Sequence, residues 1–220
     1  MAALTVELHC HTCYSKDSLL RPGELLRAAR LKGLDRVAIT DHNTIQGALQ
    51  AAKLEPDRVI VGEEIMTTQG ELLAFFLSEG IPAGLEPEEA IGRLRDQGAV
   101  ISVSHPFDPH RAGAWKPTDL ETIRSDIDAL EVYNARCFTT EPNRQAAAWA
   151  KKAGLLGTAG SDAHAASELG RAVMLMPAFQ GAKEFKAALA HSEVQGRLSS
   201  PFVHLYSRWA LWRKAMGWEM

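Results

Sequence analysis

Short apolar runs alternate along the chain with segments whose apolar residues recur at helical spacing. Eight runs predict strands buried on both faces: 6–9, 36–40, 58–62, 72–77, 99–103, 129–133, 155–159 and 172–176. The clearest helical patterns begin near Pro22, Pro87 and Asn143 and stop at a glycine, and shorter ones cover 44–53, 118–126 and 182–191. This alternation predicts an α/β fold with a parallel sheet, and periodicity alone leaves open whether the sheet closes into a barrel.

The domain organisation follows from the same pattern. We find no Gly/Ser-rich linker and no internal repeat, so residues 1–200 are expected to form one domain. The tail, 201–220, carries apolar residues at helical spacing: Phe202, Leu205, Trp209, Trp212 and Met216. It predicts a terminal helix whose aromatic face packs on the domain. A contact between two copies in a homo-oligomer is an alternative, and a helix lying at a membrane interface is the weakest one.

Composition excludes several classes of protein. Hydrophobic residues make up 46% and charged residues 23% of the 220, which is ordinary globular usage. A net charge of −3 makes long nucleic acid an unexpected partner, and no apolar run reaches membrane length. The first residues do not resemble a signal peptide, and three cysteines do not suggest a disulfide framework. We therefore expect a cytoplasmic protein without a membrane partner.

The histidines are placed unusually. Five of the eight fall in short polar segments just after predicted strands, together with carboxylates: His9-Cys10-His11, Asp41-His42, Glu63-Glu64, His105, and Asp162-Ala163-His164. Residues two apart in extended chain point to the same side, and the carboxyl ends of parallel strands meet at one edge. Imidazole and carboxylate ligands favour Zn, Mn or Fe, and these ligands outnumber the needs of one ion. The pattern predicts a site for more than one divalent cation.

These segments resemble a known family. ELHCHT, ITDHNT, VGEEI, SHP and GSDAH, in this order, are similar to the motifs of the polymerase-and-histidinol-phosphatase (PHP) family of metal-dependent phosphoesterases. The resemblance extends over residues 4–176. It implies a distorted (β/α)7 TIM-like barrel with two or three divalent ions.

The resemblance also implies ligand roles. His9, His11, Glu64 and Asp162 would hold a first ion, and Glu64 would bridge to a second ion that also takes His105. A third ion would take Asp17, His42 and His164. The sequence departs from the family at the fourth strand, which supplies no histidine and offers Glu71 as a replacement. Both two and three ions therefore remain open.

Other residues are candidates for substrate contacts and proton transfer. His42 or His164 could protonate the leaving group, and Asp41 could orient a ligand or serve as the acid. Arg136 and Arg171 follow or precede predicted strands and could bind phosphate, although a surface ion pair is an equal reading for Arg136.

We expect hydrolysis of small phosphomonoesters or nucleotides by a hydroxide held between cations. A 3′–5′ exonuclease or phosphodiesterase acting on short oligonucleotides is an alternative, as is a metal-binding domain without catalysis. An amidohydrolase acting on carbon–nitrogen bonds would usually place a lysine where Glu64 stands.

Overall fold

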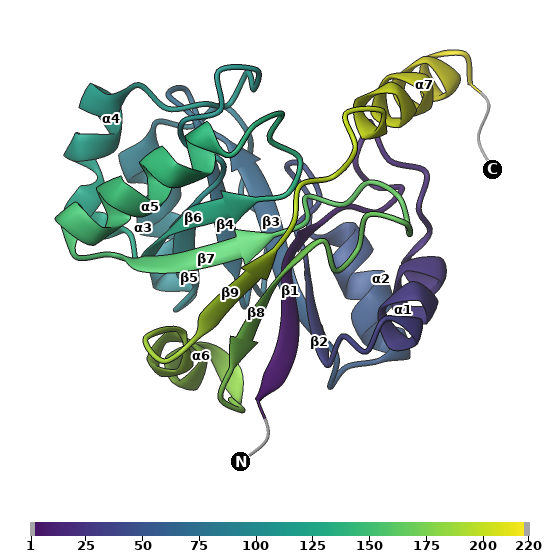
Figure 1. The fold of residues 1–220 in the computed structure, drawn as a ribbon, viewed down its shortest axis with the longest axis horizontal. Helices are drawn as coiled ribbons and strands as arrows, with labels where there is room; N and C mark the ends of the chain where they lie inside the picture. The colour runs from purple at the N-terminus through teal and green to yellow at the C-terminus, as the bar shows by residue number, and fades with distance from the viewer. Residues whose placement is uncertain (1–2, 218–220) are drawn as a thin grey trace.

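The computed structural model describes residues 3–217, whose strands form one curved sheet covered by helices (Figure 1). The strands are β1 (Leu4–Cys10), β2 (Arg36–Ile39), β3 (Val59–Met66), β4 (Glu71–Phe75), β5 (Val100–Val103), β6 (Ala129–Asn134), β7 (Leu156–Gly160), β8 (Ala172–Met176) and β9 (Glu193–Gly196). The helices are α1 (Pro22–Leu31), α2 (Gln46–Leu54), α3 (Pro87–Asp96), α4 (Pro117–Thr122), α5 (Glu141–Ala153), α6 (Gly181–Leu189) and α7 (Val203–Ala215).

The sheet has nine strands in the order β7-β6-β5-β4-β3-β2-β1-β8-β9. Strands β1, β2 and β3 are parallel, as are β5, β6 and β7, but β4 runs antiparallel to both neighbours and β8 antiparallel to β1 and β9. The prediction of a wholly parallel sheet is therefore wrong. The cause at β4 is the short turn after β3, where Thr67 N donates to Gly70 O, because a turn this short joins only antiparallel strands.

The sheet curls until the edge strand β7 approaches β1. Cys10 and Ala163 form an isolated bridge, and His11 N donates to Ala163 O over 2.8 Å. Gly160 permits this approach, because a Cβ there would lie 2.2 Å from His9 Cβ. The expected barrel-like α/β fold is confirmed, with nine strands where the apolar runs predicted eight and the resemblance implied seven. Curling brings the carboxyl ends of the parallel strands to one rim.

Apolar residues alternate along the strands between helix-covered and interior positions. In β4, Leu72 and Ala74 belong to the core that includes α3 and α5, whereas Leu73 and Phe75 belong to the core that includes Phe185 of α6. A third core joins α1 and α2 to the outer side of β1 and β2. Figure 1 shows α6 at the end of the sheet opposite α7, and the core that includes Phe185 of α6 fills the interior at that end.

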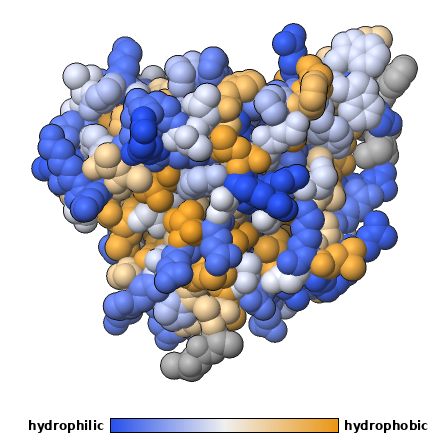
Figure 2. All heavy atoms as spheres, viewed as in Figure 1, coloured by the Kyte–Doolittle hydropathy of each residue, from blue (hydrophilic) through white to orange (hydrophobic). Residues whose placement is uncertain are grey.

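Helix α7 confirms the terminal helix but contacts the protein with another face than predicted. Its buried residues are Ser207 and Ala210, while the predicted contact face is exposed: Phe202, Leu205, Trp209, Trp212 and Met216. Figure 2 shows large pale and orange side chains where α7 projects at the upper right. The prediction that the aromatic face packs on the domain is wrong, because α7 meets the rim through polar contacts of Ser207 and Lys214 on another face. The boundary at residue 200 and the contact between copies stay predictions, and residues 218–220 lie outside the described part.

Among the helices of residues 3–217, none combines the length and apolarity needed to cross a membrane.

Candidate metal centre

Two irregularities in the strands aim polar side chains at the upper rim. The register of β1 against β2 shifts between Glu7 and Cys10. Leu8 packs in the interior core, and because of this shift His9 and His11 also lie on the interior side. The register of β6 against β7 shifts between Glu131 and Tyr133, and Asn134 then reaches Glu131 Oε2 over 3.0 Å. Such bulges re-aim side chains beside functional sites.

Four predicted ligands of the first ion meet in the interior of the rim. His9 Nε2 lies 3.3 Å from Glu64 Oε2 and 3.7 Å from Asp162 Oδ1. His11 Nε2 lies 3.4 Å and 3.3 Å from the same two oxygens. Of these atoms, His9 Nε2, His11 Nε2 and Glu64 Oε2 are buried without a hydrogen-bond partner among the described residues. Buried polar atoms are normally satisfied, so this gathering suits a bound cation.

The other ring nitrogens of these histidines are already engaged. His9 Nδ1 lies 2.9 Å from Glu131 Oε1, which can only accept when ionised. His11 Nδ1 lies 3.1 Å from Ser15 Oγ, whose own proton goes to Asp41 Oδ1 over 2.6 Å. Both rings therefore carry the proton on Nδ1 and present the Nε2 lone pair to the centre, which is the tautomer that binds a metal.

Glu64 faces two groups of ligands with its two oxygens. Oε2 faces His9 and His11 and also His42, whose Nδ1 is 3.0 Å away. Oε1 lies 3.0 Å from His105 Nε2 and accepts from Ser104 Oγ over 2.5 Å. A carboxylate between two sets of nitrogen donors has the geometry of a bridging ligand.

Glu71, the first residue of β4, is the residue suggested as a replacement for the histidine that the fourth strand lacks. Its Oε2 lies 3.6 Å from His105 Nε2, and its Oε1 lies 3.7 Å from His42 Nδ1. Ligand atoms of His42, Glu64 and Glu71 all lie within 4.8 Å of one another. The residues present therefore fit a second cation beside Glu64 and Glu71, with His42 or His105 as its imidazole ligand.

A third group combines the remaining predicted ligands. Ligand atoms of His11, His42 and His164 lie within 4.8 Å of one another. Asp17 Oδ2 is 3.1 Å from His164 Nε2, and Asp17 Oδ1 is 3.7 Å from His42 Nε2. Asp17 and His42 are the most exposed of the predicted ligands, so the third group lies at the opening.

Two of these residues hold backbone conformations that side chains disfavour. His105 has φ +23° and Asp162 has φ +52°. Such conformations are costly for residues other than glycine and cluster at functional sites. Here they follow the ends of β5 and β7 and turn the two side chains into the rim.

The electrostatics of the centre favour anionic carboxylates. Burial by itself would raise the pKa of Glu64 and of Asp162. His9 and His42 hold the pKa of Glu64 well below its usual range, and Arg111 and His9 do the same for the pKa of Asp162. Burial and the adjacent Glu64 raise the pKa of Glu71. Burial lowers the pKa of His9, yet Glu64, Glu131 and Asp162 raise it well above its usual value. Protons and metal cations therefore compete for the same lone pairs.

The structure places Asp41 away from the opening. Its carboxylate accepts from Thr12 N, Thr12 Oγ1 and Ser15 Oγ, each over 2.6 Å. Through Ser15 Oγ it orients the ring of His11, and the same hydroxyl accepts from His42 N over 3.1 Å. Of the two roles considered for Asp41, this arrangement supports orientation.

The two arginines predicted to bind substrate do not reach the opening. Arg136 is 2% exposed and lies between His164, Glu168 and α7, which together use all three of its nitrogens. Arg171 lies near Lys32, whose pKa is lowered by burial and by the Arg171 charge. The position of an arginine next to a predicted strand does not show which later segment of the chain covers its side chain.

Four residues of the centre were not among the predicted site residues: Ser104, Arg111, Glu131 and Asn134. Arg111 reaches back from the β5–α4 connection to pair with Asp162 Oδ2. Burial lowers the pKa of Arg111, but the nearby Asp162 and Glu64 raise it by more than burial lowers it, so the guanidinium stays charged. Glu131 could have been inferred from its place near the end of a predicted strand, whereas the loop of Arg111 carries no such signal.

Replacing Glu131 with glutamine is expected to weaken cation binding by about 10–100-fold, the usual effect of losing a ligand-orienting partner. Glu131 Oε1 faces His9 Nδ1, and Oε2 accepts from His105 N over 2.8 Å. An amide would turn its NH₂ group toward one of these donors. Metal content after dialysis measures the effect, with Glu121→Gln on the exposed surface as control. Equal metal content in both variants would contradict this role.

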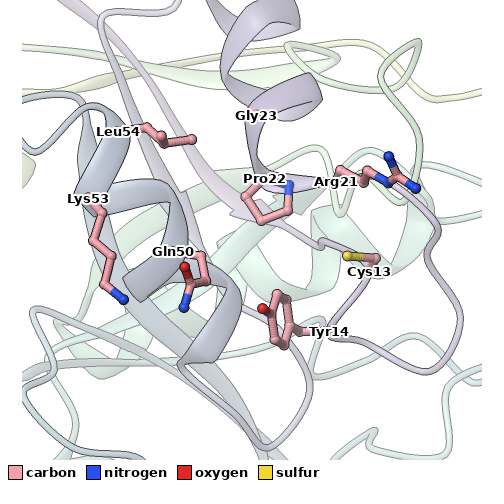
Figure 3. Close-up of a pocket in the computed structure, with 8 residues that line it drawn as sticks. All are labelled: Cys13, Tyr14, Arg21, Pro22, Gly23, Gln50, Lys53 and Leu54. Atoms are coloured by element: carbon pink, nitrogen blue, oxygen red, sulfur yellow. The ribbon is translucent and has the colours of Figure 1, made fainter. Parts of the chain in front are cut away.

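A separate groove of about 570 Å³ lies beside the turn after β1 (Figure 3). Its charged side chains are Arg21 and Lys53, and it also exposes Cys13 and Tyr14 between α1 and α2. None of the predicted ligands lines it. Cys10, the other cysteine of the CxxC, is buried and donates to Ala38 O, so the two thiols do not share a site.

Comparisons with known proteins agree with this geometry. The PHP domain model matches residues 7–86, and a second model, described as PHP-associated, matches residues 140–194. An uncharacterized protein of Methanocaldococcus jannaschii is 40% identical over 145 residues, or 60% of this chain and 82% of that protein. Another from the same organism is 39% identical over 172 residues, or 77% of this chain and 69% of that protein.

Solved structures share the fold at low identity. PsfC from Pseudomonas syringae has a TM-score of 0.69 at 17% identity, covering 98% of this chain and 100% of that one. A candidate metal-dependent phosphoesterase from Bifidobacterium adolescentis has 0.61 at 21%, covering 73% and 87%. The lesion-specific endonuclease EndoQ from Pyrococcus furiosus has 0.65 at 18%, covering 90% and 60%.

The matched segments contain every predicted ligand except His105, which lies between them. With the relatives and the barrel-like fold, they show that the chain belongs to the PHP family of metal-dependent phosphoesterases.

Proposed function

We propose that this protein hydrolyses small phosphomonoesters or nucleotides with the help of two or three divalent cations. The observation that carries the proposal is the set of buried, unpartnered acceptor atoms on His9, His11 and Glu64 that face one another. A shared cation satisfies all three acceptors at once, and zinc, manganese or iron suits their chemistry.

Bound divalent cations would lower the pKa of water and offset charge on the phosphate oxygens. The chain contributes the positions. His9, His11, Glu64 and Asp162 would hold one ion, His105 and Glu71 would complete a second site with Glu64, and Asp17, His42 and His164 would form the third. A carboxylate at residue 64 distinguishes this centre from amidohydrolase sites that use a lysine bridge.

The opening of the centre indicates where a substrate would approach. The His42 side chain is 18% exposed and that of His164 is 1% exposed. Of the two candidate acids, His42 is therefore better placed to give a proton to a leaving oxygen when two cations are bound and the third site, which would use His42 as a ligand, is empty. Arg111 keeps its charge beside Asp162 and is the arginine best placed to meet a phosphate oxygen.

The size of the substrate is argued from charge. A net charge of −3 provides no extended basic surface along which a long nucleic acid could be held. A small phosphorylated molecule needs only the centre itself. The fold is shared with an endonuclease as well as with a candidate phosphoesterase, so a diester substrate is the alternative outcome of the test.

The test uses protein stripped of metal with a chelator and then supplied with Mn²⁺ or Zn²⁺. We expect phosphate release from a nucleoside monophosphate after metal is restored, and slower shortening of a short oligonucleotide at equal concentration. Faster shortening of the oligonucleotide would assign a phosphodiesterase. Metal binding without turnover of either substrate would support a non-catalytic metal-binding domain.

A further inference from the structure

Helix α7 is attached to the turn that leads from His11 to Asp17. Lys214 Nζ donates to Cys13 O and to Ser15 O, each over 2.6 Å. In Figure 1 the purple segment after β1 passes close to the yellow helix at the upper right. One ammonium therefore holds two carbonyls of the turn that positions Asp17.

The same helix is attached to His164 through Arg136. Arg136 NH2 donates to Val203 O over 3.0 Å and to Ser207 Oγ over 2.9 Å, both on α7. Its NH1 lies 2.7 Å from His164 Nδ1, and its Nε lies 3.2 Å from Glu168 Oε2. The guanidinium thus links the helix to the loop after β7.

The two attachments converge on one pair of ligands. His164 Nε2 and Asp17 Oδ2, which come from distant parts of the chain, are 3.1 Å apart. Each belongs to a loop that α7 holds by polar contacts. His204 of α7 adds a further contact, because its Nε2 lies 3.1 Å from Arg136 O and its ring stacks on Phe138. Ser207 and Ala210 are the buried residues of the helix.

We propose that α7 is a clamp that completes the third cation site, with Lys214 and Arg136 as its positioning residues. Lys214 keeps Asp17 in place, and Arg136 keeps His164 in place. The inference rests on the metal centre proposed above and adds a role for the C-terminal helix. It gives Arg136 a role in positioning His164 rather than in binding the substrate.

The tautomer of His164 is compatible with this role. His164 Nδ1 lies 2.9 Å from Asp162 O, and a carbonyl can only accept. A proton on Nδ1 directed at this carbonyl leaves Nε2 free to bind a cation beside Asp17. With this proton on Nδ1, Arg136 NH1 cannot donate to the ring, and Arg136 holds the His164 loop through Glu168 instead. Glu168 Oε2 pairs with Arg136 Nε, and Glu168 Oε1 accepts from His164 N over 3.3 Å.

The test compares cation binding in the full chain and two variants of α7 that leave every ligand intact. Lys214→Met removes the hold on the Cys13–Ser15 turn, and Ser207→Ala removes one acceptor of Arg136. Arg208→Met, on an exposed position of the same helix, is the matched control. Mn²⁺ alone is titrated by calorimetry, bound metal is counted after dialysis, and circular dichroism checks folding.

We expect Lys214→Met to weaken the last-bound Mn²⁺ by about 10–100-fold, the range seen when ligand-orienting partners are lost, and to leave the tightest Mn²⁺ unchanged. Ser207→Ala should weaken the same ion to a smaller extent. The clamp is overturned if both variants bind every ion as tightly as the unmodified protein, or if Arg208→Met loses as much. Because the readout needs no substrate, a protein that binds all its ions but hydrolyses no phosphate ester would refute the proposed function and not the clamp.

Discussion

Replacing Glu64 with glutamine is expected to lower phosphoesterase activity by about 10³-fold, or roughly 4 kcal/mol of transition-state stabilisation at 1.36 kcal/mol per tenfold. Glu64 is the residue that the other ligands share: its Oε2 faces His9 and His11, and its Oε1 faces His105. Glutamine keeps the shape but removes the charge and one acceptor. Two cations held close together would then lack the anion between them.

The measurement is kcat/KM for a nucleoside monophosphate in the presence of Mn²⁺, together with the number of ions bound. Glu63→Gln is the matched control, because Glu63 is the preceding residue on β3 and accepts from Ile81 N rather than facing the histidines. We expect Glu63→Gln to retain activity. A Glu64→Gln variant that keeps both its ions and its turnover would refute the bridging role.

Removing metal is expected to lower the melting temperature of the protein by roughly 8–16 °C. A ligand present at 1,000 times its Kd stabilises the folded state by about 4 kcal/mol, and a domain of this size shifts by about 2–4 °C per kcal/mol. The physical reason is local. Without a cation, buried acceptors on His9, His11 and Glu64 face one another with no partner among the described residues.

Differential scanning calorimetry of chelated and Mn²⁺- or Zn²⁺-loaded protein measures this shift. Ca²⁺ should restore less stability, because it prefers oxygen ligands and this centre offers many imidazoles. Glu64→Gln serves as the control for effects of the chelator itself, since its melting temperature should respond far less. Equal melting temperatures with and without metal would show that the centre holds no cation under those conditions.

Much of the site was predictable because ligands follow strands. The apolar runs mark where each strand ends, and polar residues just beyond a buried strand reach the rim whatever the exact curvature of the sheet. Hence His9, His11, Glu64, His105 and Asp162 could be assigned to one place before any coordinates were known. Glu71 could be named as a replacement ligand, and the structure places it beside His105 and His42.

Other features depended on contacts between distant segments. Arg136 has the chemistry of a phosphate ligand, but Glu168 and α7 surround it. The spacing of apolar residues in α7 predicts a buried aromatic face, but the helix meets the rim through Ser207, Arg136 and Lys214. β4 runs antiparallel because a four-residue turn joins it to β3. The prediction from the strand pattern took no account of the length of that turn.

The sequence by itself determined the alternation of strands and helices, the candidate ligand residues and the family, because periodicity, residue chemistry and motif order are local properties. Only the tertiary structure decided which ring nitrogen faces the centre, which arginine pairs with Asp162 and which face of α7 is covered. Those properties depend on hydrogen bonds and packing between segments that meet only in the folded chain, such as His9 with Glu131 and Cys13 with Lys214.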